Sequence, residues 1–496
     1  MLQHSTFKLF IFILFFPGYL FGWQSPVADK PMAPYLEKFN NAPPLKNANW
    51  GFCLLEPETG KVLSSFQREK IVTPASTLKL LTTAAALELL GKDFHFETHL
   101  EYDGTLDSCG VLHGNLYVKG GGDPTLGSEL FKGKSNVDLI LNNFAEAVHN
   151  AGIKSIKGSV IADDTFFPDC LLPSTWQSTD VGNYYAAGPS GLNFAENSYQ
   201  LIFQPGKAVG EKTTLIGTFP ESIPGLTLQN QVSTWHSGSG DRARVNINPD
   251  RSERSILGTI PMGVDSFIIR GSVPDPSLLA ANLLDAKLKS SGIMTEKGPD
   301  KFRLTSSVKE NPCRLRFYTM YSPTLFEIIQ QVNLKSHNLF AENLLVMIGK
   351  IFRDQGNYES GISVVQGFLE SKGINISGMQ VYDGSGLSPE NKLSSHQLAS
   401  MLSTIQQDHL FPDFIQTLPV AGVSGTLLNF CKNNKAKGKI YAKSGSMSKI
   451  KCYAGYALNK KGEWMPFALL INNYAGSSST LNVHVQELME AIVELN

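Results

Sequence analysis

The secondary structure that the sequence predicts changes twice along the chain. Between about Phe94 and Ser266, short strand-like runs alternate with turns rich in Gly and Pro, which is typical of β structure. On both sides of this region the sequence predicts longer helices mixed with strands. We therefore expect the two ends of the chain to form one α/β unit, with the β-rich region inserted into it.

The length supports such a division, because 496 residues exceed what one simple core accommodates. We expect two or three domains. A formal net charge of −1 shows no basic excess, so a nucleic-acid partner is not expected. The sequence also contains no motif that calls for a metal or another cofactor.

The N-terminus has the pattern of a secretory signal. Lys8 precedes an apolar run, Leu9 to Phe16, and Gly22 offers a small residue at a cleavage position. The run is shorter than the ~20 residues that a membrane span needs, and no later apolar run is long enough. We expect residues 1–22 to be a cleaved signal peptide, a mature chain beginning near Trp23 in the periplasm or cell envelope, and no transmembrane anchor.

Six cysteines are widely spaced, and no CxxC pair suggests a zinc site. An even number in an exported chain permits disulfides, although single buried thiols fit equally well. The pattern leaves both alternatives open for all six residues: Cys53, Cys109, Cys170, Cys313, Cys431 and Cys452.

Turn, cap and stop residues mark several helices and strands at the two ends of the chain. Residues 49–65 predict a β-hairpin. A buried helix rich in Leu and Ala follows it, with Thr73 as its cap, Pro74 in its first turn and Gly91 at its end. The C-terminal half predicts helices over 322–332, 339–351 and 479–495, and strands over 451–457 and 464–471, with a further strand ending at Lys443.

Two stretches of the inserted region resemble each other. Residues 141–153 and 278–293 each read as a helix that runs into Ser/Ala-Gly-Ile, with a further Gly a few residues later. Each stretch can be one helix–strand unit of a small α/β domain, with a β module between them. A chance likeness is the alternative.

Ser76 and Lys79 form the first candidate site. On a helix, residues i and i+3 lie on one face, about 5–6 Å apart at Cβ. Serine needs a neighbouring base to become a nucleophile, and a lysine whose pKa is lowered by burial or nearby positive charge can be that base. The motif alone is weak, because four other serines also have Lys three residues later: Ser5, Ser306, Ser446 and Ser448.

Two tripeptides strengthen the assignment. Ser336-His337-Asn338 lies between two predicted helices, and Lys443-Ser444-Gly445 follows a predicted strand. Each alone fits a helix-capping loop or a strand end. Together and in this order, SxxK, SxN and KSG match the set used by β-lactamases and penicillin-binding proteins. The chain contains neither HExxH nor GxSxG, so zinc-peptidase and α/β-hydrolase interpretations lose their usual support.

From about Asn49 to its end, the chain resembles the D-alanyl-D-alanine carboxypeptidase/endopeptidases with large insertions, the class C low-molecular-mass penicillin-binding proteins. The 260-residue interval between Ser76 and Ser336 leaves room for two inserted modules. The resemblance is carried by the three motifs and by longer runs, namely Gly120–Leu126 (GGGDPTL), Ala162–Asp164 (ADD), Ser336–Leu344 (SHNLFAENL), Asp383–Ser388 (DGSGLS) and Leu418–Leu427 (LPVAGVSGTL).

The resemblance implies an α/β fold, with a serine β-lactamase/transpeptidase-like core of antiparallel sheet and flanking helices. The core would comprise residues 27–95 and 315–496. An inserted α/β domain would comprise 96–195 and 267–314, and an inserted β-rich domain 196–266.

The resemblance also implies roles at the first two motifs. Ser76 would attack the carbonyl of the penultimate D-Ala of a peptidoglycan stem peptide, and Lys79 would take its proton. Ser336 and Lys443 would relay a proton to the leaving amine. Asn338 would hold the substrate amide. β-Lactam antibiotics would act as inhibitors that acylate Ser76.

The third motif would bind the end of the substrate. Lys443 and Ser444 would hold its terminal carboxylate, while Gly445 would let its backbone approach the strand. The N–H groups of Ser76 and Ser446 would form the oxyanion hole. The family commonly has Thr at the position of Ser444, and this change keeps the hydroxyl.

Two further points concern substrate contacts. Many relatives have Arg after DGSGLS, whereas this chain has Pro389, which puts one contact in doubt. In the resembled family an Asp of the insertion reaches the amino group of the stem-peptide side chain, and Asp164 is the better match. Its alternative role is to cap its own turn.

Two other functions compete with this interpretation. A β-lactamase or esterase on the same fold would turn penicillin over rapidly. An inactive wall-binding module would keep the fold without the chemistry, although the complete set of catalytic residues argues against it.

Overall fold

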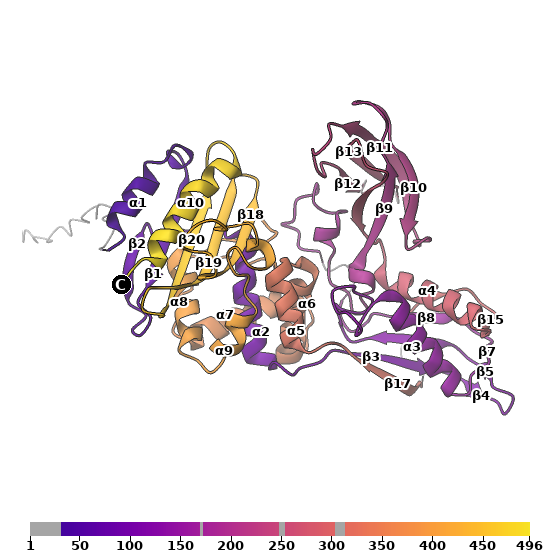
Figure 1. The fold of residues 1–496 in the computed structure, drawn as a ribbon. Coiled ribbons are helices and arrows are strands. Elements are labelled where there is room, and N and C mark those ends of the chain that lie inside the picture. Colours follow the sequence, from indigo (N-terminus) through magenta and orange to yellow (C-terminus); the bar gives the residue numbers. More distant parts are fainter. Residues whose placement is uncertain (1–30, 169–171, 248–252, 303–312) are drawn as a thin grey trace, which may run out of the picture.

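The two ends of the chain meet in one five-stranded antiparallel sheet (Figure 1). The computed structural model describes residues 31–168, 172–247, 253–302 and 313–496. The sheet has the order β18-β19-β20-β1-β2, so its N-terminal hairpin lies beside three C-terminal strands, which confirms the expected α/β core. Its strands are β1 (Asn49–Leu55), β2 (Val62–Phe66), β18 (Ile440–Met447), β19 (Ile450–Leu458) and β20 (Trp464–Asn472).

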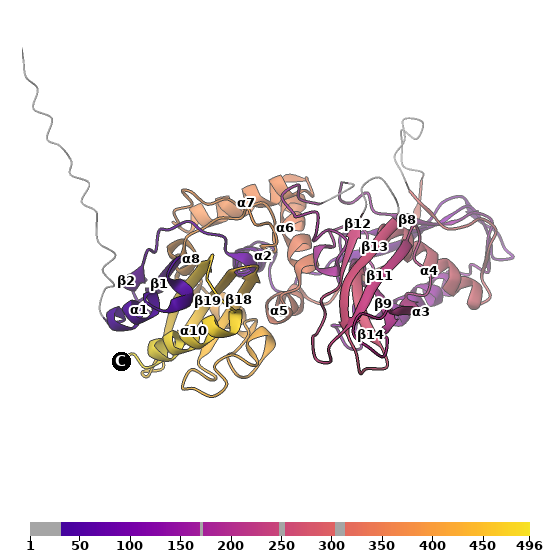
Figure 2. The ribbon, with the colours of Figure 1, turned by 90° about the horizontal axis from the view of Figure 1, so that it is seen from above.

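Both faces of this sheet are covered, because successive side chains of a strand point to opposite faces. Trp50, Phe52 and Leu54 of β1 are buried in a cluster with helices α1 (Ala33–Asn40) and α10 (Ser478–Val493). Cys53 and Leu55 alternate with them and belong to a second cluster beneath the helical lobe. Figure 2 shows α1 and α10 on one side of the sheet and α8 with α2 on the other.

The helical lobe places the first two motifs against the sheet. At its centre α2 (Lys79–Leu90) is buried nearly all round, as its Leu- and Ala-rich sequence predicts. Around it lie α5 (Leu325–Lys335), α6 (Asn338–Arg353), α7 (Tyr358–Ser371), α8 (Ser395–Gln406) and α9 (Phe411–Gln416).

The predicted start of α2 was wrong in one detail. Thr73 does not cap it: a 3₁₀ turn, η2 (Ala75–Leu78), precedes the helix, and no side-chain hydrogen bond from a described residue caps this turn. The Thr73 hydroxyl instead donates to the Pro389 carbonyl, at 3.1 Å. Gly91 ends α2 with φ +84°, as expected.

The inserted region lies to one side of this core, beyond α5 and α6 (Figure 1). Helices α3 (Val137–Asn150) and α4 (Pro276–Ser290) pack together there. They lie beside two sheets with the orders β16-β8-β6-β3-β17 and β15-β7-β5-β4. The strands are β3 (Glu97–Tyr102), β4 (Thr105–Leu106), β5 (Val111–His113), β6 (Leu116–Gly120), β7 (Ser155–Ile156), β8 (Val160–Asp163), β15 (Met294–Thr295), β16 (Asp300–Lys301) and β17 (Leu315–Tyr321).

The two similar stretches lie side by side in this part of the structure. The strands that follow α3 pair in parallel with those that follow α4: β7 with β15, and β8 with β16. The stretches are therefore equivalent helix–strand units that share their sheets, as expected for a repeat.

Between these units the chain forms the β-rich part. One sheet has the order β10-β9-β14 and the other β11-β13-β12, with a separate hydrophobic cluster among them. β14 pairs with β9, and β17 pairs with β3, so strands near residues 267 and 315 belong to the inserted sheets. The domain limits themselves stay a prediction. The strands are β9 (Ser198–Gln204), β10 (Thr214–Phe219), β11 (Thr227–Trp235), β12 (Arg244–Ile247), β13 (Glu253–Pro261) and β14 (Phe267–Ser272).

Two expectations from the sequence concern cysteines and membranes. The five described cysteines are free, and three of them are buried in the core: Cys53, Cys431 and Cys452. Cys170 and the expected signal peptide lie outside the described residues. No helix in the described part of the chain combines the length and apolar character needed to cross a bilayer.

Candidate active site

Ser76 and Lys79 meet at the start of α2. Ser76 lies partly exposed in the turn η2, and Ala75 before it has φ +47°, an unfavourable left-handed conformation. Lys79 is fully buried, and its Nζ donates to Ser76 Oγ at 3.1 Å. The serine hydroxyl is thus within reach of one amine that is shielded from water.

Two further acceptors hold the Lys79 amine. Nζ donates to Asn338 Oδ1 and to the Ser385 carbonyl, each at 2.7 Å. Burial lowers the pKa of Lys79 to about 8, although the negative charges of Glu342 and Asp383 oppose the shift. A substantial fraction of Lys79 is therefore neutral near pH 8 and able to accept a proton.

The second motif joins α5 to α6. Ser336 ends α5 with φ +59°, and Asn338 is the first residue of α6. The Ser336 hydroxyl accepts from Lys443 Nζ at 2.9 Å, while Asn338 is bound to Lys79. The SxN tripeptide thus connects the two buried lysines, one on each side.

The third motif lies inside strand β18 and does not follow it, which corrects the expected position. Lys443 is fully buried, and its Nζ also donates to the Ser444 carbonyl, at 2.8 Å. Burial, and then the positive charge of Lys79, hold the pKa of Lys443 well below its ordinary value. β18 continues to Met447 because it pairs with β19 along its whole length.

Gly445 allows β18 to approach the turn that carries Ser76. A Cβ at this position would lie 2.8 Å from the Pro74 carbonyl oxygen and 2.9 Å from the Ser76 nitrogen. Beside it, the Ser444 hydroxyl donates to Thr426 Oγ1 at 3.0 Å, and Ser446 is exposed. These residues therefore form an accessible strand edge next to Ser76, where a peptide backbone can lie.

The DGSGLS loop, Asp383–Ser388, borders the site beside Lys79. The Glu342 carboxylate accepts from the backbone N–H groups of Gly384 and Ser385, at 2.8 and 2.9 Å, and so fixes the carbonyl that binds Lys79. Gly386 has φ +79°, and a Cβ there would lie 2.0 Å from the Ala75 carbonyl oxygen. Only glycine fits this close approach to the turn of Ser76.

Asp164 makes its polar side-chain contacts within the inserted region. Its Oδ2 accepts from the Ser277 hydroxyl and pairs with Lys301, each at 2.5 Å, and the residue is buried. These side chains line a cavity of about 530 Å³ within the inserted region. Contact between Asp164 and a substrate amine stays a prediction, and it requires competition with Lys301. The turn-capping role belongs to Asp163, which accepts from the N–H and hydroxyl of Thr165.

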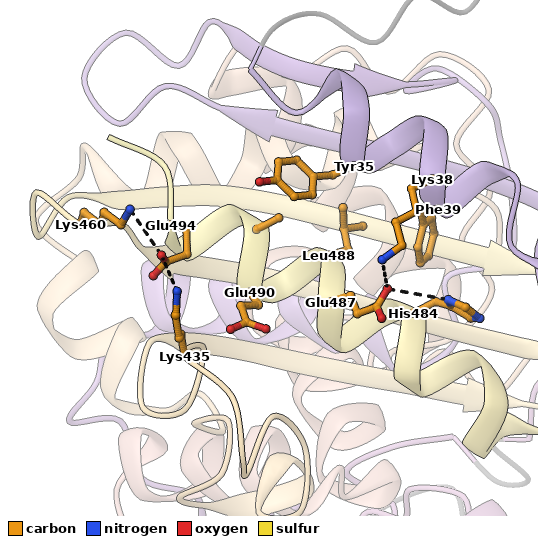
Figure 3. A pocket seen from close by; sticks show the side chains of 11 residues that line it. Tyr35, Lys38, Phe39, Lys435, Lys460, His484, Glu487, Leu488, Glu490 and Glu494 are labelled. Atoms are coloured by element: carbon orange, nitrogen blue, oxygen red, sulfur yellow. Dashed lines mark hydrogen bonds and ion pairs between the residues drawn. The ribbon is translucent and has the colours of Figure 1, made fainter.

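A second hollow, of about 470 Å³, lies between α1 and α10, on the face of the sheet opposite the helical lobe (Figure 3). Most of its charges are paired with one another: Lys38 with Glu487, and both Lys435 and Lys460 with Glu494. It is lined by none of the residues of the three motifs. It is therefore not the place of the chemistry.

Within the described ranges, one cluster has ligand atoms close enough to hold a metal ion: Glu88, Asp408 and His409. The Lys372 amine already lies between its two carboxylates, at 3.1 Å from Glu88 and 2.8 Å from Asp408. The positive charge that a metal would supply is therefore provided by Lys372. The cluster lies near the end of α2, away from Ser76.

Several residues that shape the site were not predicted from the sequence. Glu342 and Asp383 belong to runs that mark the family resemblance, but nothing in those runs indicates that they surround Lys79. Pro389, which replaces an expected Arg, presents its carbonyl to Thr73 and to Lys392 Nζ, the latter at 2.7 Å. Contacts from the inserted region, described below, have no local sequence signal.

The sequence matches a known family over most of its length. The sequence profile of the D-Ala-D-Ala carboxypeptidase 3 (S13) family matches residues 33–494. The chain is 28% identical over 444 residues to a D-alanyl-D-alanine carboxypeptidase of Actinomadura sp. (strain R39), covering 88% of this chain and 79% of that protein.

Solved structures agree on the fold. The chain is similar to penicillin-binding protein 4 of Haemophilus influenzae, with a TM-score of 0.78 at 22% identity, covering 93% of this chain and 99% of that one. A second structure of that protein, complexed with a β-lactam, gives a TM-score of 0.73 at 21% identity, covering 92% of this chain and 98% of that one. The likeness spans the inserted region as well as the core.

Proposed function

Since the chain belongs to the D-Ala-D-Ala carboxypeptidase 3 (S13) family, we propose that it is a serine DD-carboxypeptidase and DD-endopeptidase that forms an acyl-enzyme on Ser76. Its substrates are the stem peptides of peptidoglycan, cut at D-alanyl bonds. The proposal extends to export of the protein, with residues 1–22 removed and the enzyme acting in the periplasm or cell envelope.

The observation that carries this proposal is the pairing of two buried lysines with two serines, one from each of the first two motifs. Lys79 lies 3.1 Å from Ser76 Oγ, and Lys443 lies 2.9 Å from Ser336 Oγ. Burial lowers the pKa of both lysines, and the positive charge of Lys79 lowers the pKa of Lys443 further. Such an arrangement favours at least one neutral amine, which is what activation of a serine requires.

Acylation then follows in balanced steps. Ser76 Oγ attacks the carbonyl carbon of the penultimate D-Ala, and its proton passes to neutral Lys79. The N–H groups of Ser76 and Ser446 stabilise the oxyanion. When the peptide bond breaks, the leaving amine takes a proton supplied through Ser336 and Lys443. Water then attacks the acyl carbon: its hydroxyl stays on the released peptide as part of the new carboxyl group, and its other proton returns Ser76 to the hydroxyl form. The proton left on Lys79 replaces the one that Ser336 and Lys443 gave up, so every group returns to its starting state.

Substrate orientation is assigned to the strand edge and to Asn338. The substrate backbone lies along β18 at Gly445, and the terminal carboxylate meets Lys443 and the Ser444 hydroxyl. The Asn338 amide holds the substrate backbone. Penicillin presents a carboxylate and a reactive carbonyl in a similar relation, so we expect β-lactams to acylate Ser76 and to inhibit the enzyme.

Release of D-Ala from a stem pentapeptide tests the function. Wild-type enzyme should release D-Ala, and Ser76→Ala should release none above background while keeping its thermal unfolding midpoint. Rapid hydrolysis of penicillin with no D-Ala release would instead identify a β-lactamase. Neither reaction with the wild type would identify a wall-binding module.

A further inference from the structure

The inserted region contacts the second motif directly. Tyr185, in the short 3₁₀ turn η3 (Tyr184–Ala186), accepts a hydrogen bond at its carbonyl from Asn338 Nδ2, at 2.7 Å. Glu196, in a second such turn, η4 (Ala195–Asn197), lies 3.0 Å from His337 Nε2. Two consecutive residues of SxN are therefore held by a segment more than 140 residues earlier in the chain.

The backbone around Glu196 has an unfavourable conformation. Ala195, Glu196 and Asn197 have φ of +52°, +56° and +48°, three successive non-glycine residues in the left-handed region. Such a run forms only where surrounding contacts fix it, and strain of this kind gathers at functional sites. Here the Asn197 side chain bonds both Phe194 N, at 3.0 Å, and the Gly188 carbonyl, at 3.0 Å. The result is a rigid turn that directs Glu196 at His337.

The contact between Glu196 and His337 is shielded from water. The two side chains are 19% and 17% exposed, and Glu196 also accepts from the Ser128 hydroxyl at 2.6 Å. Burial raises the pKa of Glu196, but its interactions with His337, the hydrogen bond from Ser128 and the charge of Arg270 together outweigh burial and leave this pKa below its ordinary value. Glu196 is therefore an ionised acceptor for His337.

The helix that begins at the second motif has no side-chain cap among the described residues. His337 is the N-cap of α6, and no side-chain hydrogen bond among the described residues caps this helix there. Ser336 before it is left-handed, at φ +59°. The His337 ring stacks on Phe340, at 3.9 Å between ring centroids, so Glu196 and Phe340 together fix it. A ring held on both sides fixes the backbone from which Ser336 and Asn338 project.

We propose that Glu196 is a positioning residue for the reaction, acting through His337 to keep Ser336 against Lys443 and Asn338 against Lys79. The proposal rests on the proposed function, and it goes further by giving the inserted region a direct part in acylation. The insertion is then required for activity even though none of its side chains reacts.

The test compares acylation by a fluorescent penicillin in five proteins: wild type, Glu196→Ala, Glu196→Gln, His337→Ala and the Glu196→Ala/His337→Ala double variant. Glu196→Ala should lower the second-order rate constant about tenfold to a hundredfold, because small misplacements of catalytic groups cost that much. Glu196→Gln keeps an acceptor for His337 and should stay within about threefold of wild type. The Glu196→Ala/His337→Ala double variant should be no slower than the slower single variant.

A matched control is the exposed pair of His396 and Glu69, which are 2.7 Å apart. Glu69→Ala should leave acylation unchanged. Acylation by Glu196→Ala within twofold of wild type would overturn the proposal, as would fully additive losses in the double variant. A fall in rate matched by Glu196→Gln would also count against it.

Hydrogen–deuterium exchange separates failure of this proposal from failure of the proposed function. Peptides covering residues 334–342 should exchange faster in Glu196→Ala than in wild type, whether or not the wild type reacts with penicillin. Absence of labelling in the wild type would refute the proposed function alone. Unchanged exchange in these peptides would refute the positioning role alone.

Discussion

The rate of acylation should follow the titration of Lys79. This amine can act as a base only when neutral, and its burial lowers its pKa to about 8. With that value, roughly one hundredth of the molecules carry a neutral Lys79 at pH 6, about one tenth at pH 7 and about half at pH 8. Glu342 has its pKa raised to about 8 by burial and titrates in the same range, so the second-order acylation rate constant should rise by at least about tenfold from pH 6 to 8.

The assay is stopped-flow acylation by a fluorescent penicillin, from pH 5.5 to 9, at penicillin concentrations low enough to report the free enzyme. Lys79→Arg supplies the matched control, because it keeps the positive charge but does not lose its proton. This variant should be nearly inactive at every pH. A rate constant that stays level between pH 6 and 8, or normal acylation by Lys79→Arg, would refute Lys79 as the base.

Three further variants test the surroundings of the site. Trp176→Phe removes the indole N–H that donates to Asp383 Oδ2 at 2.9 Å. Without this hydrogen bond the negative charge of Asp383 acts more strongly on Lys79, so the pKa of Lys79 should rise and the pH profile of acylation should move to higher pH. A shift to lower pH would contradict this. Gly386→Ala should lower the acylation rate constant at least about tenfold, because the new Cβ clashes with the Ala75 carbonyl. Gly91 has a similar φ but no neighbouring atom within contact distance of a Cβ, so Gly91→Ala should cost only about 1–2 kcal/mol of unfolding free energy and leave acylation intact. Asp164→Asn should lower the unfolding free energy by roughly 1–3 kcal/mol, because it weakens the contact with Lys301. It should also lower kcat/KM for peptides with a free side-chain amine and leave penicillin acylation almost unchanged; equal loss on both substrates would mean that Asp164 only supports the fold.

Local patterns predicted the core well. The hairpin at Asn49 has strand-like runs on both sides of a Gly turn, and α2 has a Leu- and Ala-rich body that ends at Gly91. The two helix–strand units were visible because they repeat the same short pattern. These features depend on residues close together in the sequence, where propensity and periodicity act directly.

Non-local features were predicted less well. The Thr73 cap was wrong because the Thr73 hydroxyl binds the carbonyl of Pro389, 316 residues later. β18 extends through Lys443 because β19 pairs with it, and a sequence pattern that ends in Ser-Gly-Ser does not show that pairing. Glu196 escaped notice for the same reason: its role depends on a contact with His337, 141 residues away.

The central claim is that Ser76 carries the acyl group, and mass mapping of a penicillin adduct tests it most directly. Wild-type enzyme incubated with penicillin, digested and analysed by mass spectrometry should show one penicilloyl adduct, on the peptide that contains Ser76. Ser76→Ala should show none. An adduct on another serine, or an adduct that persists in Ser76→Ala, would contradict the account.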